Sequence, residues 1–294
     1  MEIFGIPSQA LFGQLLIGLI NGSFYALLSL GLAVIFGLLN IINFTHGAQY
    51  MLGAFCAYLF LEKLGVGYWW SLLIAPVVVG ITGVIIERTM LSKLYKLDHL
   101  YGLLLTFGLA LIIQGLFRNE FGSSGLPYRI PQELQGAQNL GFMFLPNYRG
   151  WVIVVSLVVC LSTWYVIERT KLGAYLRAAT ENPQLVQAFG INVPRMITLT
   201  YGFGVALAAF AGVMAAPIYQ VNPLMGADLI IVVFAVVVIG GMGSIMGAIV
   251  TGFGLGIIEG LTKVFYPEAS NTVIFIIMAI VLMFKPAGLF GTQK

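Results

Sequence analysis

The longest stretch without a charged side chain decides where this chain can fold. From Ile3 to Leu61 there is no Asp, Glu, Lys or Arg. A bilayer's hydrocarbon core is crossed by about 20 apolar residues, so this stretch holds more than one crossing. Charged residues make up 9% of the whole chain, against roughly 25% in soluble domains. The sequence therefore predicts an all-α polytopic membrane protein.

Shorter charge-free runs repeat this pattern along the chain, and we expect about eight to ten crossings within a single domain that covers residues 1–294. The predicted crossings lie at about 11–29, 31–43, 46–62, 69–87, 101–117, 151–168, 196–217, 228–243, 244–261 and 271–284. The second and the eighth of these either cross fully or turn back as interrupted or re-entrant segments.

The positive charges indicate the orientation of the chain. They gather between Arg88 and Lys96, between Arg169 and Arg195, and on the tail that carries Lys285 and Lys294. Lys and Arg are enriched in cytoplasmic loops, so we place all three regions in the cytoplasm. The long connection from Asn119 to Arg149 then lies outside. The side of the N-terminus is not fixed, because region 30–43 can cross or turn back.

One polar segment, residues 171–195, stands out between the membrane-length runs. Asn182 and Pro183 predict the start of a short helix, with an N-cap side chain followed by proline at the first helical position. Leu185 and Phe189 give that helix apolar bulk, and Gly190 favours its end. A helix this short does not span a bilayer. It either folds back on its own bundle or docks on a soluble partner.

A cluster of hydrogen-bonding side chains interrupts the first charge-free stretch. It contains Asn40, Asn43, Thr45, His46 and Gln49. Polar groups in the hydrocarbon region are costly unless they face other helices or a water-filled path. Asn40, Asn43, His46 and Gln49 are therefore candidates for lining a translocation pathway. The alternative, favoured for Asn43 and Thr45, is that these groups cap a helix break. His46 has no second ligand nearby in sequence, so no metal site is expected.

Glycines gather in a second cluster, where Gly240, Gly241 and Gly243 follow an apolar run. Glycine permits a positive φ and a close backbone approach, so these residues predict a helix break. The alternative is plain packing, which the small-xxx-small spacings Gly243–Gly247 and Gly252–Gly256 favour.

No known catalytic arrangement occurs in the sequence. There is no G-x-x-x-x-G-K-[ST] motif, so the chain carries no P-loop and cannot itself be the ATPase of an ATP-driven pump. Enzyme triads, paired carboxylates, metal clusters and nucleic-acid-binding runs are also missing, so we expect no cofactor. Glu259 is expected to pair with Lys263 four residues later on a helix. The energy source is thus another polypeptide. The alternative is a self-contained secondary carrier or channel for a small neutral solute.

Four stretches together resemble one family, the permease subunits of branched-chain amino acid ABC importers. The stretches are Gly37–Ala54, Gly173–Asn192, Ile239–Ala248 and Lys285–Gly291. They extend over essentially the whole chain. The glycine stretch alone is a weak signal, but the four in combination are specific.

The resemblance implies a non-catalytic permease of the bacterial inner membrane that works by alternating access. Its partners would be a second, similar permease, two cytoplasmic ATPases and a soluble substrate-binding protein. Segment 171–195 would take the place of the ATPase-coupling helix, whose expected contact residues are Arg177, Glu181, Asn182, Pro183, Leu185 and Phe189. Related systems leave the substrate open among branched-chain amino acids, amides, urea and aromatic acids.

Overall fold

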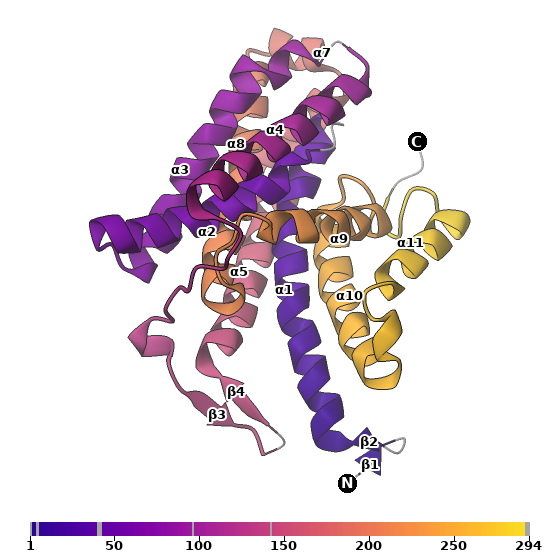
Figure 1. Ribbon diagram of the computed structural model, residues 1–294. Helices are drawn as coiled ribbons and strands as arrows, with labels where there is room; N and C mark the ends of the chain where they lie inside the picture. The colour runs from indigo at the N-terminus through magenta and orange to yellow at the C-terminus, as the bar shows by residue number, and fades with distance from the viewer. Residues whose placement is uncertain (1, 4–5, 40–42, 96, 142, 292–294) are drawn as a thin grey trace.

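The computed structural model describes residues 2–3, 6–39, 43–95, 97–141 and 143–291. It is a helical bundle with two small hairpins (Figure 1). The helices are α1 (Ser8–Leu39), α2 (Thr45–Leu64), α3 (Tyr68–Thr89), α4 (His99–Phe121), α5 (Asn147–Arg169), α6 (Lys171–Glu181), α7 (Pro183–Ala188), α8 (Val193–Tyr219), α9 (Met225–Gly240), α10 (Ile245–Phe265) and α11 (Val273–Phe284). Short 3₁₀ turns lie at Leu91–Lys93, Gln132–Leu134 and Pro267–Ala269. Strand β1 (Glu2–Ile3) pairs with β2 (Ile6–Pro7), and β3 (Ala137–Asn139) pairs with β4 (Phe144–Pro146), both antiparallel.

The first two predicted crossings are one helix, and the prediction of separate segments at 11–29 and 31–43 is wrong. α1 runs without interruption from Ser8 to Leu39. Gly31 lies inside it as a packing position, where an added Cβ would come within 2.7 Å of the Gly204 carbonyl oxygen of α8. Glycine interior to a helix weakens it by about 1 kcal/mol but lets another backbone approach. Here the close approach of α8 accounts for the glycine.

α1 lies at the centre of the bundle. Of its most apolar window 83% is buried, against 17% for α4. It packs against α10, α8, α5 and α9, and α8 packs in turn on α2 and α3. Glycines permit this: a Cβ on Gly22 would touch Phe253 of α10, and one on Gly53 of α2 would lie 2.1 Å from the Ala209 carbonyl oxygen of α8. Helices in lipid associate through such small residues.

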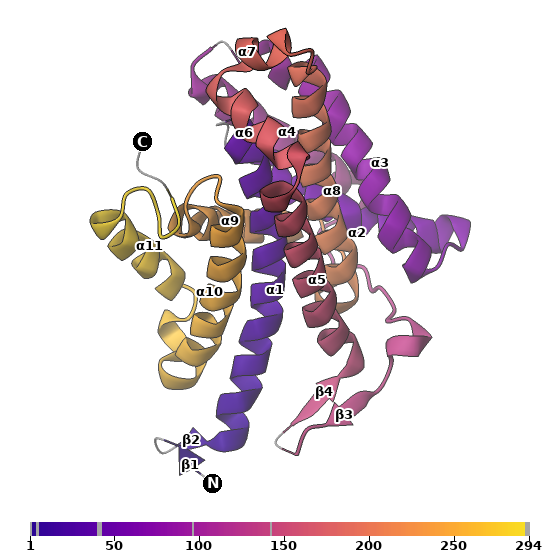
Figure 2. The ribbon, with the colours of Figure 1, turned by 180° about the vertical axis from the view of Figure 1, so that it is seen from behind.

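Six helices among the described residues are long and apolar enough to cross a membrane: α1, α3 (extended to Lys93), α4, α5, α8 and α10. Two shorter apolar helices are α9 and α11. In both ribbon views α9 lies crosswise beside the long axis of α1 (Figures 1 and 2). α9 ends inside the protein and the chain turns back into α10, as expected for an interrupted segment lined by protein rather than lipid.

The two ends of the bundle differ in charge. α6 and α7 lie at the end opposite the N-terminus and the β3–β4 hairpin (Figure 2). The end of α3 lies beside α7 and the start of α8, so the positive residues Arg88, Lys171, Arg177 and Arg195 belong to this end of the bundle. By the positive-inside rule this end is cytoplasmic. Because α1 crosses once, the N-terminus falls on the external side, which the sequence had left open.

Candidate translocation and coupling site

The α6–α7 segment rests on the start of α8 through a small apolar core. Leu185 N donates to Asn182 Oδ1 at 2.9 Å, so Asn182 caps α7, and Pro183 is its first residue. Val186 is buried and packs with Ala179 of α6 and Val193 of α8. Gly190 has a φ of 84° just after the helix end at Phe189. The helix start and end expected from the sequence are both confirmed.

The opposite side of this segment is apolar and open. Phe189 is 78% exposed and Leu185 54%. Leu172 and Tyr175 of α6 are exposed as well, and so is the Glu181 carboxylate. These side chains lie at the cytoplasmic end, beyond the long apolar helices. A cluster of exposed apolar groups at such a place is typical of a protein contact surface.

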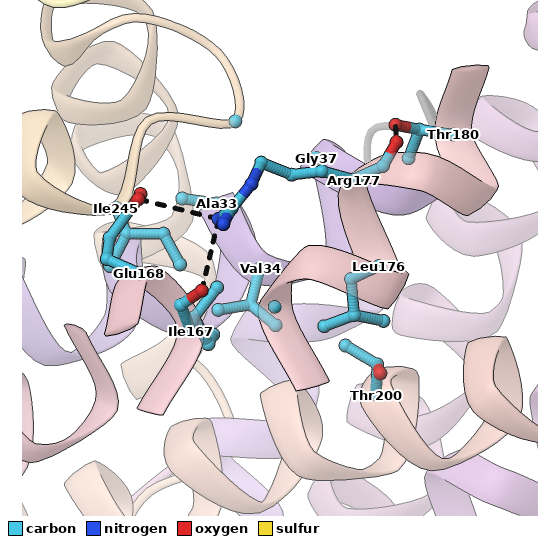
Figure 3. Close-up of a pocket in the computed structure, with 12 residues that line it drawn as sticks. Ala33, Val34, Gly37, Ile167, Glu168, Leu176, Arg177, Thr180, Thr200 and Ile245 are labelled. Carbon is cyan, nitrogen blue, oxygen red and sulfur yellow. Dashed lines mark hydrogen bonds and ion pairs between the residues drawn. The ribbon is translucent and has the colours of Figure 1, made fainter. Parts of the chain in front are cut away.

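Arg177 does not point outward with them. Its guanidinium donates to the Ile167 carbonyl oxygen of α5 at 3.1 Å and approaches Glu168 Oε2 at 3.4 Å (Figure 3). Both side chains are about half exposed, at 54% and 42%, so the ion pair itself contributes little. Gly173 lies so close that an added Cβ would overlap the Ile167 carbonyl oxygen. The start of α6 is therefore fixed against the end of α5.

A cavity of about 90 Å³ separates α6 from the glycine cluster. Its lining includes Leu176 and Arg177 of α6, Gly37 at the end of α1, and Gly243 and Ile245 where α10 begins (Figure 3). This cytoplasmic cavity brings the predicted coupling segment and the predicted helix break next to each other. No spacing in the sequence indicates that proximity.

The chain is broken at the glycine cluster. α9 ends at Gly240, Gly241 has φ 104° and ψ 119°, Gly243 has φ 86°, and α10 begins at Ile245. Ser244 Oγ accepts from Gly247 N at 3.1 Å and caps the new helix. A Cβ on Gly243 would lie 3.1 Å from the Cα of Gly37. The end of α1 thus touches the break between α9 and α10.

The C-terminal loop after α11 binds the carbonyl groups that α9 leaves free. Leu289 N donates to the Ile239 carbonyl oxygen at 2.8 Å, and Phe290 N donates to that of Gly240 at 3.0 Å. The last carbonyls of a helix need such partners. A Cβ on Gly288 would come within 2.5 Å of Gly241 N, so glycine is required on both sides of this contact.

The amide and histidine cluster is closed to solvent. Asn43, Thr45, His46 and Gln49 are all buried, and Asn40 lies outside the described residues. Asn43 Nδ2 donates to Gln49 Oε1 at 3.4 Å, and Thr45 Oγ1 donates to Asn43 Oδ1. α2 begins at Thr45 where the polar run indicates a helix start, but no side chain caps it. The Asn43 side chain turns into the bundle instead.

His46 lies where three helices meet. Its Nε2 is 3.0 Å from the Leu28 carbonyl oxygen of α1. An added Cβ on Gly31 would come within 2.9 Å of its ring. Across the described ranges no group of three or more His, Cys, Asp or Glu side chains could hold a metal ion. The cluster therefore forms a sealed layer in this conformation rather than an open path.

Sequence reasoning missed a buried carboxylate near the cytoplasmic end. Glu87 of α3 is 2% exposed and accepts from Thr198 Oγ1 of α8 at 2.7 Å and from the Tyr95 hydroxyl. Burial, followed by the hydrogen bond to Glu87, raises the pKa of Tyr95 above its ordinary value. In the sequence Glu87 is the last residue of the predicted crossing 69–87 and is followed by Arg88, so it looks like an exposed helix-end residue. No signal in the sequence indicates this burial, because the donors Thr198 and Tyr95 reach Glu87 only in the folded chain.

The comparisons with known proteins decide the family. Residues 14–282 match the model of the family described as branched-chain amino acid transport system / permease component. The high-affinity branched-chain amino acid transport system permease protein BraD of Pseudomonas aeruginosa is 30% identical over 96% of both chains. LivH of Escherichia coli (strain K12), with the same description, is 29% identical over 96% of both. The chain belongs to this permease family.

This permease is a multi-pass protein of the inner membrane, in agreement with its six long apolar helices. A second permease protein, LivM of Escherichia coli (strain K12), is 28% identical over 92% of this chain and 68% of LivM. No solved structure matches the present chain. Three of the four stretches that carry the resemblance in sequence meet at the helix break, through Gly37, Gly243 and Gly291. Gly37 and Gly243 also line the cytoplasmic cavity.

Proposed function

We propose that this permease is the membrane-spanning subunit of an ATP-driven importer that moves branched-chain amino acids by alternating access. The observation that carries the proposal is the match to LivH and BraD over 96% of the chain, because both are named for that transport. The absence of a P-loop motif from the sequence supports an energy source on another chain.

The partners follow from the same reasoning. The chain is similar to both LivH and LivM, so a second, related permease is the expected membrane partner. Two cytoplasmic ATPases supply the energy, and a soluble binding protein delivers the substrate at the external side. Segment 171–195 is the ATPase-coupling segment of the single permease domain 1–294.

The coupling role is supported by the exposed apolar side chains. Phe189 and Leu185 are separated by one helical turn, so they project on the same side of α7. Val186, on the other side, anchors α7 to α8. An ATPase surface that covers Phe189 and Leu185 would push on α6, whose far side faces the helix break across the cytoplasmic cavity. Glu181, Asn182 and Pro183 fix the geometry between the two short helices.

Reconstitution tests the transport proposal. The chain with its second permease, ATPases and binding protein should take up leucine into vesicles only with ATP. Gradient-driven uptake by the purified chain alone would instead establish a self-contained carrier or channel.

Substitutions on α7 test the coupling surface. Phe189→Asp or Leu185→Asp should abolish ATP-driven uptake while membrane insertion stays normal, because a charge cannot enter an apolar contact. Gln184→Asp places the same charge on an exposed polar position of α7 and serves as the control. Normal uptake by Phe189→Asp and Leu185→Asp would remove the coupling role.

A further inference from the structure

A second cavity, of about 310 Å³, opens toward the external side of the bundle. It lies between α1, α2, the end of α8 and the start of α9. Tyr219 and Asp228 are exposed and form its mouth, and Phe24, Tyr25 and Tyr50 are buried and form its floor. Just after α8, Val221 forms an isolated antiparallel β-bridge with Leu126 of the external connection. The volume of the cavity is at the lower end of the range of about 300–1,000 Å³ for small-molecule sites.

The hydroxyl of Tyr50 has no hydrogen-bond partner among the described residues. Tyr50 is 1% exposed and lines the cavity. Its backbone is held in place, since an added Cβ on Gly212 of α8 would overlap the Tyr50 carbonyl oxygen. Buried polar groups are hydrogen-bonded in nearly all folded proteins. This hydroxyl is therefore free to donate a hydrogen bond to a group that enters the cavity.

The other polar groups of the floor are already engaged. Tyr25 donates to Glu259 Oε2 at 2.6 Å, and Asn21 Nδ2 approaches Glu259 Oε1 at 3.4 Å. The Tyr219 hydroxyl donates to Asn21 Oδ1 at 2.8 Å. Lys263 pairs with Glu259, as the sequence predicted, and neutralises its charge. Glu259 thus braces the cavity wall and has no free charge to offer a ligand.

Asp228, in contrast, makes no ion pair within the part of the chain that the structure describes. It lies in the first turn of α9 at the cavity mouth. The cavity therefore offers one free carboxylate, one free hydroxyl and an apolar wall made by Phe24, Met225 and Leu229. A ligand that satisfies all three has a cationic group, a hydrogen-bond acceptor and an apolar body.

We propose that this external cavity is the permease's own substrate site and that it binds a zwitterionic amino acid with an apolar side chain. The ammonium group pairs with Asp228, the carboxylate accepts from the Tyr50 hydroxyl, and the side chain packs on Phe24, Met225 and Leu229. This inference rests on the proposed transport function and adds to it the residues that would bind the substrate. Urea and simple amides lack the cation that Asp228 would select.

A cysteine at the cavity mouth measures binding directly. Asn222 lines the mouth and has no role in the proposed contacts, so Asn222→Cys in the purified complex reports access by a membrane-impermeant thiol reagent. Leucine should slow the modification with a saturable concentration dependence, and urea should not. Gln138→Cys on the exposed β3 strand should be modified at the same rate with and without leucine.

Substitutions in the Asn222→Cys background then assign the contacts. Asp228→Asn should raise the leucine concentration for half-protection about tenfold or more, and Tyr50→Phe about fivefold, since each removes a bond to a charged group. Tyr128→Phe is the control, because Tyr128 is also a buried tyrosine but does not line this cavity. Tyr50→Phe breaks no hydrogen bond among the residues that the structure describes, so its thermal midpoint should equal that of the parent.

The outcomes separate the two proposals. ATP-driven leucine uptake without any protection of Asn222→Cys would overturn the cavity assignment and leave the transport function standing. Protection that Tyr50→Phe and Asp228→Asn leave unchanged would also overturn it. Protection by leucine in a complex that takes up no leucine would keep the site and remove the transport function.

Discussion

Replacing Gly241 by alanine tests whether the helix break is essential. Gly241 has φ 104° and ψ 119°, a conformation that costs an L-residue about 1–3 kcal/mol. The new Cβ would also lie 2.5 Å from Gly291 N and 2.9 Å from Gly291 Cα. These are backbone atoms that no rotamer change can move, so overpacking adds about 1–3 kcal/mol. Together the substitution strains the contact by about 2–6 kcal/mol.

The weaker side of that contact should give way. The C-terminal loop is held by two hydrogen bonds, from Leu289 N and Phe290 N, each contributing about 0.5–1.5 kcal/mol. Releasing the loop relieves the overpacking of about 1–3 kcal/mol and loses these two bonds, which together contribute about 1–3 kcal/mol, so the loop is then held only marginally. We therefore expect Gly241→Ala to release the loop and lower ATP-driven uptake, while most of the bundle stays folded.

Uptake in proteoliposomes, with limited proteolysis of the C-terminal loop, measures both effects. The control is Gly254→Ala, because Gly254 has no neighbouring atom within 4 Å of an added Cβ and lies inside α10. Alanine there should be neutral or stabilising by up to about 1 kcal/mol. If Gly241→Ala transports and resists proteolysis like Gly254→Ala, the glycines serve packing alone and the reasoning fails.

Two further substitutions address the buried polar groups. His46→Cys should resist water-soluble thiol reagents without nucleotide and react in an ATP-bound state if the cluster joins the pathway; protection in every state would leave it a packing element. Glu259→Gln should lower the thermal midpoint, because it removes the buried anionic partner of the partly exposed Lys263, and adding Lys263→Met should recover part of the loss. A midpoint unchanged by Glu259→Gln would show that the pair contributes nothing.

Local chemistry made part of this structure predictable. Asn182 and Pro183 specify a helix start by hydrogen bonding and fixed φ, and Gly190 specifies its end, so neighbours in sequence were enough. The charge-free runs were equally informative, because the bilayer penalises charge regardless of which helices later pack together. The Glu259–Lys263 pair is likewise a contact within one helix.

The remaining features depend on contacts between distant segments. Gly31 looks like a boundary in sequence, yet it lies within α1 because α8 needs room there. Arg177 lies on a helix that looks free, but the end of α5 provides acceptors for it. In the sequence the stretch Lys285–Gly291 and the glycine cluster are two separate features. Nothing in their residues shows that one supplies the hydrogen-bond donors for the other.

The distribution of close contacts indicates which part of the permease can move. α1 and α10 touch backbone to backbone along much of their length, through Gly18, Gly22, Gly252 and Gly256, and sliding them would separate atoms over several turns. The α6–α7 segment, in contrast, is fixed at its start, where Gly173 and Arg177 contact the end of α5, and beyond that it is held by a small apolar core. The break between α9 and α10 can bend without the loss of a hydrogen bond within either helix. Force applied at α7 would therefore shift α6 and the break, which lie on either side of the cytoplasmic cavity, before it disturbed the tightly packed pair of α1 and α10.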